Sequence, residues 1–183
     1  MSSLADGTPG RAVMPAGLRR WALTVHVMTS VGWLGAVAAF LALAVAGLAA
    51  QDPATVRGAY IGADVLTDAV IVPLCLTSLV TGVVQSLGTR WGLLRHWWVV
   101  VKLALTVAAT ALLLLHSQPI GHLGELATAG ATFGAGTGRM QVQLLVDAVA
   151  ALVVLAGATA LAVFKPRGLT RHGWRVQQPS RAK

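Results

Sequence analysis

The sequence predicts an all-α membrane protein, a bundle of four transmembrane helices with both termini in the cytoplasm. Three observations predict this fold: 56% of the residues are hydrophobic, only 11% are charged, and the apolar residues gather in four long runs. A soluble domain carries about 25% charged residues, and its surface needs more polar groups than this chain has. The alternation with period two that is typical of transmembrane barrel strands is not found in the sequence.

Four apolar runs are long enough to be transmembrane helices, since a helix needs about 20 residues to cross a hydrocarbon core of roughly 30 Å. They lie in a predicted transmembrane domain over residues 19–165, at about 21–49, 59–87, 97–116 and 141–164. Residues 1–18 are predicted to be a flexible cytoplasmic N-terminus, and residues 166–183 a basic cytoplasmic tail. Residues 117–140 are interpreted as an external loop, because their second half is a Gly/Ala/Thr tract typical of a linker.

The cations predict the orientation, because cytoplasmic loops carry an excess of Lys and Arg. One side carries Arg11, Arg19, Arg20, Arg90, Arg95, Lys165, Arg167, Arg171, Arg175, Arg181 and Lys183, and the other carries Arg57 and Arg139. The first side is therefore predicted to be cytoplasmic, in the plasma (inner) membrane of a bacterium. Tryptophans near the cytoplasmic helix ends are predicted interface anchors: Trp21, Trp91, Trp97 and Trp98.

The same features predict the partners of the chain. The bilayer is the main one, and the basic tail is expected to bind anionic lipid headgroups, at about 1 kcal/mol per cation. No nucleic acid is expected, because no basic stripe alternates with aromatic residues. Gly58 and Gly62 have GxxxG spacing, which permits close helix approach within the monomer or in a homodimer. The single cysteine, Cys75, is interpreted as a packing residue.

Ionisable residues inside the runs are the candidate functional residues, because each costs roughly 2.5–3.5 kcal/mol near the membrane centre on insertion scales. From the helical rise, His26 and Lys102 lie roughly 9–10 Å deep from the cytoplasmic side. Asp64 and Asp147 lie roughly 10–12 Å deep from the other side, where His116 ends the third run. Asp68 lies between these two layers.

Several roles are open for these residues. His26, with Lys102, is a candidate ligand of haem b or of a metal ion; the alternatives for His26 are a hydrogen bond to a neighbouring helix or a proton relay. Asp64, His116 and Asp147 are candidate ligands of a divalent metal ion; the alternative for Asp64 and Asp147 is a hydrogen bond to each other, direct or through water. Lys102 is expected either to form an intramembrane ion pair with Asp68 or to extend to the headgroups.

Two stretches resemble a known family: "HVMTSVGWLG" (26–35) and "LTSLVTGVVQSLGTRWGLLRHWWVVVKLALT" (76–106). They resemble an uncharacterised actinobacterial integral-membrane family of unknown function, through His26 with Trp33-Leu34-Gly35, Pro73, Thr81-Gly82, Trp91-Gly92-Leu93, and Trp98 with Lys102. This resemblance implies a four-helix protein of the plasma membrane and no established activity. The first stretch is also distantly similar to the membrane domain of copper-resistance D proteins, which suggests metal or haem handling. The chain has four Met and one Cys, and no Met-rich run that would hold Cu(I).

The sequence thus predicts an integral plasma-membrane protein of unknown activity that binds haem or a metal ion through intramembrane His and Asp residues. One alternative is a component of a small proton- or ion-coupled transporter, since buried carboxylates and Lys102 could form a relay. A second alternative is an accessory or structural membrane subunit, whose polar residues hold the helices together. An enzyme is not favoured, because no nucleophile–base pair with a supporting motif is found.

Overall fold

Every element of the described chain is helical. The computed structural model describes residues 14–88, 96–134, 136–164, 168 and 170, and the predicted N-terminus and basic tail fall largely outside them, as do Trp91 and the cations of residues 89–95. The elements are α1 (Ala16–Ala49), α2 (Pro53–Leu66), the π-helical turn η1 (Thr67–Ile71), α3 (Val72–Gly88), α4 (Trp97–Thr128) and α5 (Gly138–Phe164).

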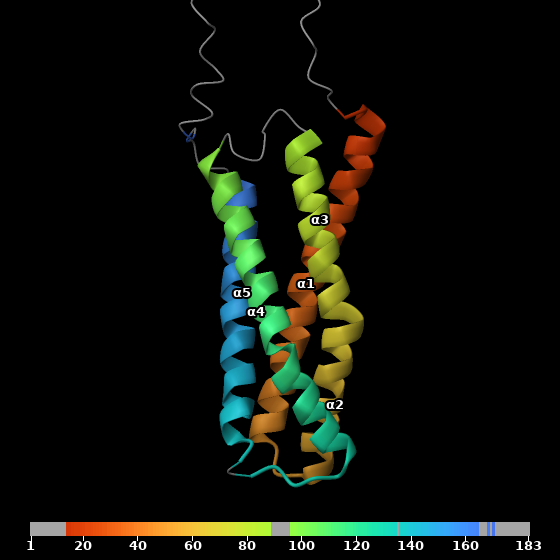
Figure 1. The fold of residues 1–183 in the computed structure, drawn as a ribbon, viewed down its shortest axis with the longest axis vertical. Coiled ribbons are helices and arrows are strands. Elements are labelled where there is room, and N and C mark those ends of the chain that lie inside the picture. The colour runs from red at the N-terminus through yellow and green to blue at the C-terminus, as the bar shows by residue number, and fades with distance from the viewer. Residues whose placement is uncertain (1–13, 89–95, 135, 165–167, 169, 171–183) are drawn as a thin grey trace, which may run out of the picture.

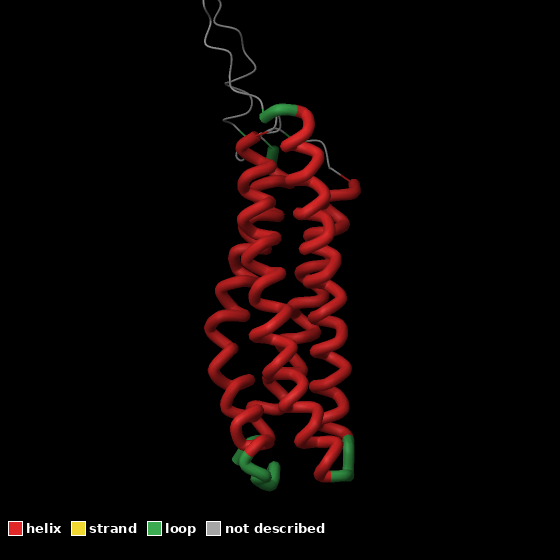
Figure 2. Tube along the Cα trace, turned by 90° about the vertical axis from the view of Figure 1, so that its right-hand side faces the viewer, coloured by secondary structure: helices red, strands yellow, loops and turns green. Residues whose placement is uncertain are grey.

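The helices run up and down along one long axis (Figure 1). We call the end where α1 and α4 begin and α3 and α5 finish the upper end, and the opposite end, with residues 50–52 and 129–137, the lower end. α2, η1 and α3 form one continuous helical segment. Seen from the side in Figure 2, the helices extend along the whole bundle and the loops lie at its two ends.

Four helical segments are long and apolar enough to cross a membrane: Ala16–Ala49, Pro53–Gly88, Trp97–Thr128 and Gly138–Phe164. Each corresponds to one of the four predicted runs. Large apolar side chains point outward along all four, among them Met28, Val65, Leu115 and Val153, each at least 60% exposed. These features indicate a multi-pass membrane protein, because such outward apolar surface is stable in hydrocarbon and not in water.

The turn between α1 and α2 uses a short polar sequence to end one helix and begin the next. Asp52 is the N-cap of α2, and its Oδ2 accepts hydrogen bonds from the backbone N–H of Thr55 at 2.9 Å and from Oγ1 of Thr55 at 2.8 Å. Pro53 follows at the first helical position, where its missing N–H costs nothing. α2 therefore begins six residues before the predicted run, and Arg57 lies within it.

A proline explains why the second segment changes its helical type. The ring of Pro73 would collide with the carbonyl group four residues earlier in a regular α-helix, and Pro73 has no N–H to donate. The structure has the π-helical turn η1 just before this proline, where the N–H of Val72 bonds to the carbonyl oxygen of Thr67. The irregularity expected at Pro73 is thus a turn with one additional residue.

The third helix is longer than predicted. Residues 117–128, interpreted as the first half of an external loop, continue α4 through Pro119 to Thr128. The helix persists because Ile120, Leu123, Gly124 and Ala127, at helical spacing, are all buried. It ends in a Schellman motif at Gly130, whose φ is 72°: Ala131 donates to Leu126, and Gly130 to Ala127.

The core lies between the four helical segments. Its buried members include Trp33, Phe40 and Ala44 of α1, Tyr60 of α2 and Leu123 of α4. Gly47 allows α1 to approach α2, since a Cβ atom at this position would lie 2.6 Å from Cζ of Tyr60. Tyr60 in turn packs against Phe133 beyond α4, with ring centroids 4.9 Å apart. α1 therefore packs against α2, α3 and α5.

The residues predicted at interfaces have mixed surroundings. Trp21 is 69% exposed and Trp97 is 58% exposed, both near the upper end, whereas Trp98 is half-buried and its ring centroid lies 6.4 Å from that of His96. In the GxxxG pair, a Cβ atom at Gly62 would contact Leu43 of α1, and one at Gly58 would have nothing within 4 Å. Gly62 thus serves packing within the chain, and Gly58 faces open space.

Candidate functional site

His26 lies between α1 and α3, near the upper end. Its Nδ1 is 3.1 Å from the carbonyl oxygen of Ser78 and 3.1 Å from Oγ1 of Thr81. A carbonyl oxygen only accepts, so Nδ1 carries the proton and Nε2 is the unprotonated nitrogen of the neutral ring. Gly82 provides the space, since a Cβ atom there would lie 3.1 Å from Cε1 of His26. The expected hydrogen bond to a neighbouring helix is present.

A second hydrogen bond extends this contact by one turn. Oγ of Ser30 lies 2.8 Å from Oγ of Ser78, at the position four residues after His26 on the same face of α1. In a membrane, hydrogen bonds between helices contribute on average about 0.6 kcal/mol each. His26 and Ser30 therefore hold α1 and α3 together through hydrogen bonds between the two helices.

Lys102 lies near His26 and not near Asp68. It is half-buried in the first turns of α4 and interacts electrostatically with His26. Asp68 is exposed and precedes Ser78 by ten residues in one helical segment, so it lies about 15 Å closer to the lower end. The described residues thus contain no ion pair between Lys102 and Asp68. The proposed ligation of haem or metal by His26 and Lys102 stays a prediction.

Near the lower end, His116 of α4 faces Asp147 of α5. Nε2 of His116 lies 3.9 Å from Oδ2 of Asp147, and Nδ1 lies 2.9 Å from the carbonyl oxygen of Leu112. Nδ1 is therefore the donor to Leu112, and Nε2 has a proton only when the ring is charged. Oδ2 of Asp147 is buried and has no hydrogen-bond partner among the described residues. At this distance the two facing atoms make no direct hydrogen bond.

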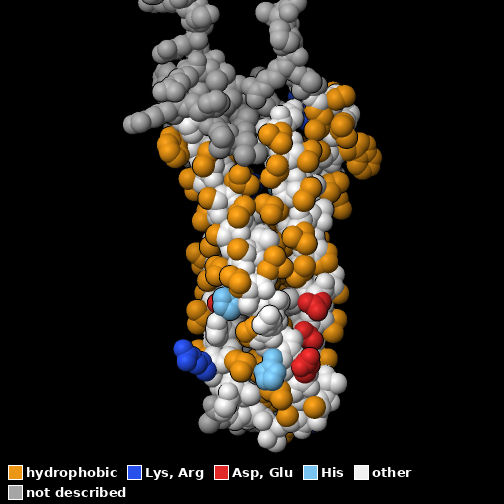
Figure 3. Space-filling model, in the orientation of Figure 1, with side chains coloured by type: hydrophobic (Ala, Val, Ile, Leu, Met, Phe, Trp, Pro, Cys, Tyr) orange, Lys and Arg blue, Asp and Glu red, His pale blue; other side chains and the backbone are white. Residues whose placement is uncertain are grey.

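Asp64 does not join this pair. Its carboxyl group packs on α4 over Gly124, where a Cβ atom would lie 2.7 Å from Oδ2, and it interacts electrostatically with Asp68 and Glu125. Acidic and histidine side chains accordingly gather on the lower half of the face in Figure 3. The described residues contain no group of three or more His, Cys, Asp and Glu that could hold a metal ion. The structure thus brings together two of the three predicted metal ligands.

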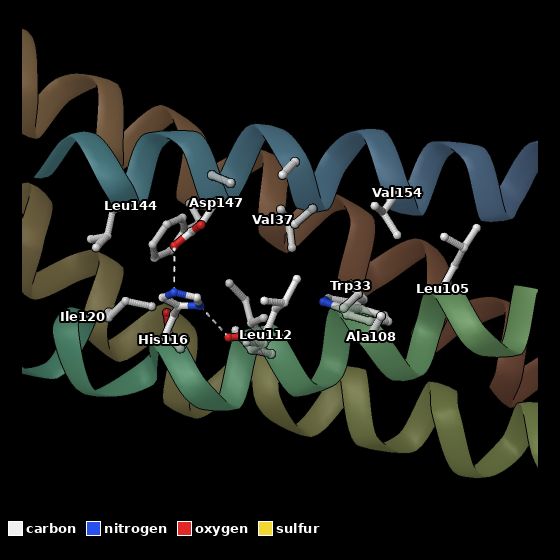
Figure 4. A pocket seen from close by; sticks show the side chains of 18 residues that line it. Trp33, Val37, Leu105, Ala108, Leu112, His116, Ile120, Leu144, Asp147 and Val154 are labelled. Atoms are coloured by element: carbon white, nitrogen blue, oxygen red, sulfur yellow. Dashed lines mark hydrogen bonds and ion pairs between the residues drawn. The ribbon is translucent and has the colours of Figure 1, made fainter. Parts of the chain in front are cut away.

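An apolar pocket adjoins the His116–Asp147 pair. It has a volume of about 150 Å³ and is lined by side chains of α1, η1, α4 and α5, most of them aliphatic or aromatic. Figure 4 shows His116 and Asp147 pointing at each other on one side and Trp33 of α1 further along. The pocket exists because alanines line it on α4 and α5, at Ala108, Ala109, Ala148, Ala150 and Ala151.

The pocket opens towards the outer surface of the bundle between α4 and α5. Leu112 is 54% exposed, and Ala108 and Ala150 are also exposed, although all three line the cavity. Trp33, in contrast, is 3% exposed and forms the inner wall. A molecule dissolved in hydrocarbon could therefore enter from the side, and its polar group would meet His116 and Asp147.

Sequence reasoning missed this pocket and the role of Trp33 in it. The signal that was available is a pair of adjacent alanines on each of two neighbouring helices, Ala108-Ala109 and Ala150-Ala151, close in sequence to the ionisable His116 and Asp147. Comparison of the chain with models of protein families, with curated proteins and with solved structures finds no match. The family resemblance of residues 26–35 and 76–106 stays a prediction.

Proposed function

We propose that this chain is a multi-pass protein of the bacterial plasma membrane that binds a small lipophilic molecule with a hydrogen-bonding oxygen. The ligand lies between α1, α4 and α5, and its oxygen contacts His116 and Asp147. Both termini lie in the cytoplasm, so the upper end faces the cytoplasm and the pair belongs to the outer half of the membrane. The surplus of cations on the predicted cytoplasmic side supports this orientation.

The unsatisfied Oδ2 of Asp147 is the observation that carries the proposal. The 3.9 Å between this atom and Nε2 of His116 is too long for a direct hydrogen bond. This distance is also shorter than the summed length of two hydrogen bonds of about 2.8 Å each. One oxygen atom beside the pair can therefore form a hydrogen bond with both atoms. A buried polar atom without a partner costs about 1–3 kcal/mol, and a bridging hydroxyl group removes this cost.

The surroundings restrict the remainder of the ligand to an apolar body. Apart from the two ionisable groups, the wall consists mainly of aliphatic and aromatic side chains, and the opening between α4 and α5 faces the lipid. A ligand that arrives from the bilayer loses no hydration on entry, because it was not in water. Haem does not fit this pocket, since about 150 Å³ holds a molecule of the size of benzene.

A photoreactive probe tests this function. Purified protein in liposomes is irradiated with dodecanol that carries a diazirine beside its hydroxyl group, and labelled peptides are identified by mass spectrometry. We expect labelling concentrated around His116 and Asp147, whereas a diazirine dodecane without hydroxyl labels all lipid-facing helices evenly.

Filling the pocket provides the matched comparison. Ala151→Phe places a ring in the cavity and is expected to lower the labelling at least fivefold, while Val153→Phe, at a 67% exposed position on the same helix, leaves it unchanged. Thermal unfolding in detergent verifies that both variants fold. Equal labelling by the two probes, or labelling that Ala151→Phe does not reduce, would contradict the proposal.

A further inference from the structure

We infer that the ligand of this pocket is a one-ring quinone or the corresponding quinol, held by Trp33 at one ring oxygen and by His116 and Asp147 at the opposite one. The inference rests on the proposed function and specifies its ligand class. It combines three observations: the size of the cavity, an unpaired donor on the inner wall, and the buried Oδ2 of Asp147 that has no hydrogen-bond partner among the described residues.

The cavity has the size of a single six-membered ring. Its volume is about 150 Å³, and an apolar cavity of this volume in a protein interior takes up benzene. A fused multi-ring molecule would not fit inside the wall of Trp33, Phe40 and Ile71. A long isoprenoid or alkyl substituent on the ring would leave through the opening beside Leu112 and lie in the bilayer.

Trp33 provides the second polar contact. The side chain is 3% exposed, lines the cavity, and its indole N–H has no hydrogen bond to any described residue. In Figure 4 the indole nitrogen is at the end of the ring that faces the His116 side. Buried Trp N–H groups usually have a partner, and this donor is available to an acceptor in the cavity.

The two polar contacts face each other across the cavity. Figure 4 shows Trp33 and His116 at different points along the cavity, and both line it. One ring with an oxygen at each end can therefore accept from Trp33 at one oxygen and contact His116 and Asp147 at the other. A ligand with a single oxygen, such as an alcohol, would leave either Trp33 or Asp147 unpaired.

The polar groups at this end of the cavity suit both redox forms of such a ring. A quinone oxygen only accepts, and it accepts a hydrogen bond from Nε2 of a charged His116. A quinol hydroxyl donates to Oδ2 of Asp147 and accepts from Nε2 of a charged His116. A carboxylic acid is a poorer ligand, because its anion would face the Asp147 carboxylate in a site of low dielectric constant.

Equilibrium binding tests the ligand class. Radiolabelled benzoquinone with a decyl substituent is titrated against the protein in nanodiscs, and saturable binding of one molecule per chain is expected. Trp33→Phe keeps an aromatic wall and removes the N–H, so it should weaken binding about five- to tenfold, the value of one hydrogen bond. Trp21→Phe, at a 69% exposed position on the same helix, is the control and leaves the affinity unchanged.

A comparison of ligands on the unaltered protein avoids any effect of substitution on folding. 4-Decylphenol, which has one ring oxygen, should bind about tenfold more weakly than decylhydroquinone, which has two. If the diazirine alcohol labels the pocket but phenol and hydroquinone bind equally, the quinone inference is wrong and the proposed function stands. If neither the alcohol nor the quinone occupies the pocket, both are wrong.

Discussion

Gly47 is the residue at which the packing of α1 leaves the least room. A Cβ atom at this position would lie 2.6 Å from Cζ and 2.9 Å from Oη of Tyr60, a side chain that is 1% exposed. Tyr60 is also held by the ring of Phe133 on its other side. The tyrosine therefore cannot move aside, and any side chain at residue 47 must separate α1 from α2.

Gly47→Ala is accordingly expected to destabilise the folded chain by about 1–3 kcal/mol, the usual cost of overpacking a core. Gly35→Ala on the same helix is the matched control, because its Cβ atom would meet nothing within 4 Å. Alanine favours a helix over glycine by up to about 1 kcal/mol, so the control should be neutral or more stable. Chemical denaturation in detergent micelles measures both, and equal stability of the two variants would be the contrary result.

Individual ionisable residues could be found from the sequence, but their grouping could not. His26, Lys102, His116 and Asp147 stood out because charge is costly in apolar runs, and each lies near a polar partner in the structure. The sequence predicts that Asp64 lies near His116, because the only position that it provides for each residue is its depth in the membrane. Depth does not specify which face of a helix meets which neighbour, and Asp64 faces Gly124 instead.

At the scale of single elements, Asp52, Pro53 and Thr55 together set the N-terminal boundary of α2. The hydroxyl group of Thr55, and then its backbone N–H, donate to Asp52, and these bonds hold the pKa of the Asp52 carboxyl below its ordinary value. The pKa is thus lower in the folded than in the unfolded chain. The hydrogen bonds to the ionised Asp52 carboxyl therefore stabilise the folded chain fully at pH values above its ordinary pKa of about 4. This stabilisation is lost as the pH falls through the lower pKa that the carboxyl has in the folded chain.

This relation predicts the effect of pH on an Asp52 variant. Asp52→Ala should unfold at a lower temperature than the unaltered chain at pH 7, and the difference should shrink below about pH 4. Asp52→Asn is the control, since asparagine caps a helix as well as aspartate does and does not titrate. Melting curves recorded by circular dichroism between pH 3 and 7 provide the measurement. A difference that is independent of pH would show that the charge has no role.

The lengths of the elements were less predictable than their existence. The third run is predicted to end at His116, yet α4 continues for three more turns, to Thr128. Its continuation is supported by tertiary packing, since Leu123 is fully buried and Gly124 receives Asp64. A local sequence signal for a loop is thus overruled by contacts with a helix that is distant in the sequence.

For the whole molecule, the composition and the four long apolar runs together predict the class of fold. In such runs, helices satisfy their own backbone groups and turn apolar side chains towards lipid. The pocket could not be predicted in this way, because it depends on how alanines of α4 and α5 come together around Trp33. Whether these alanines face one another depends on the rotation of each helix about its own axis, and the hydropathy of the sequence does not specify that rotation.

The orientation of the whole chain is tested with engineered thiols. Gln51→Cys lies in the exposed turn at the lower end, and Gly17→Cys lies near the upper end, where its Cβ atom meets nothing within 4 Å. A membrane-impermeant maleimide should label Gln51→Cys in intact spheroplasts and Gly17→Cys only after lysis. Cys75 is 1% exposed, so the parent chain should stay unlabelled. The reverse pattern would overturn the predicted orientation.

The π-helical turn η1 has a consequence for the register of the second span. A π turn contains one more residue than an α turn, so it rotates everything before it by about 100° relative to everything after it. Tyr60 and Ala63 are among the buried residues of α2 before this turn, and Cys75 and Ser78 are the buried residues of α3 after it. The span thus consists of two helices in different phases joined without a loop, and residues 67–71 are where one residue could be deleted with both helices keeping their faces, because the π turn would become an α turn.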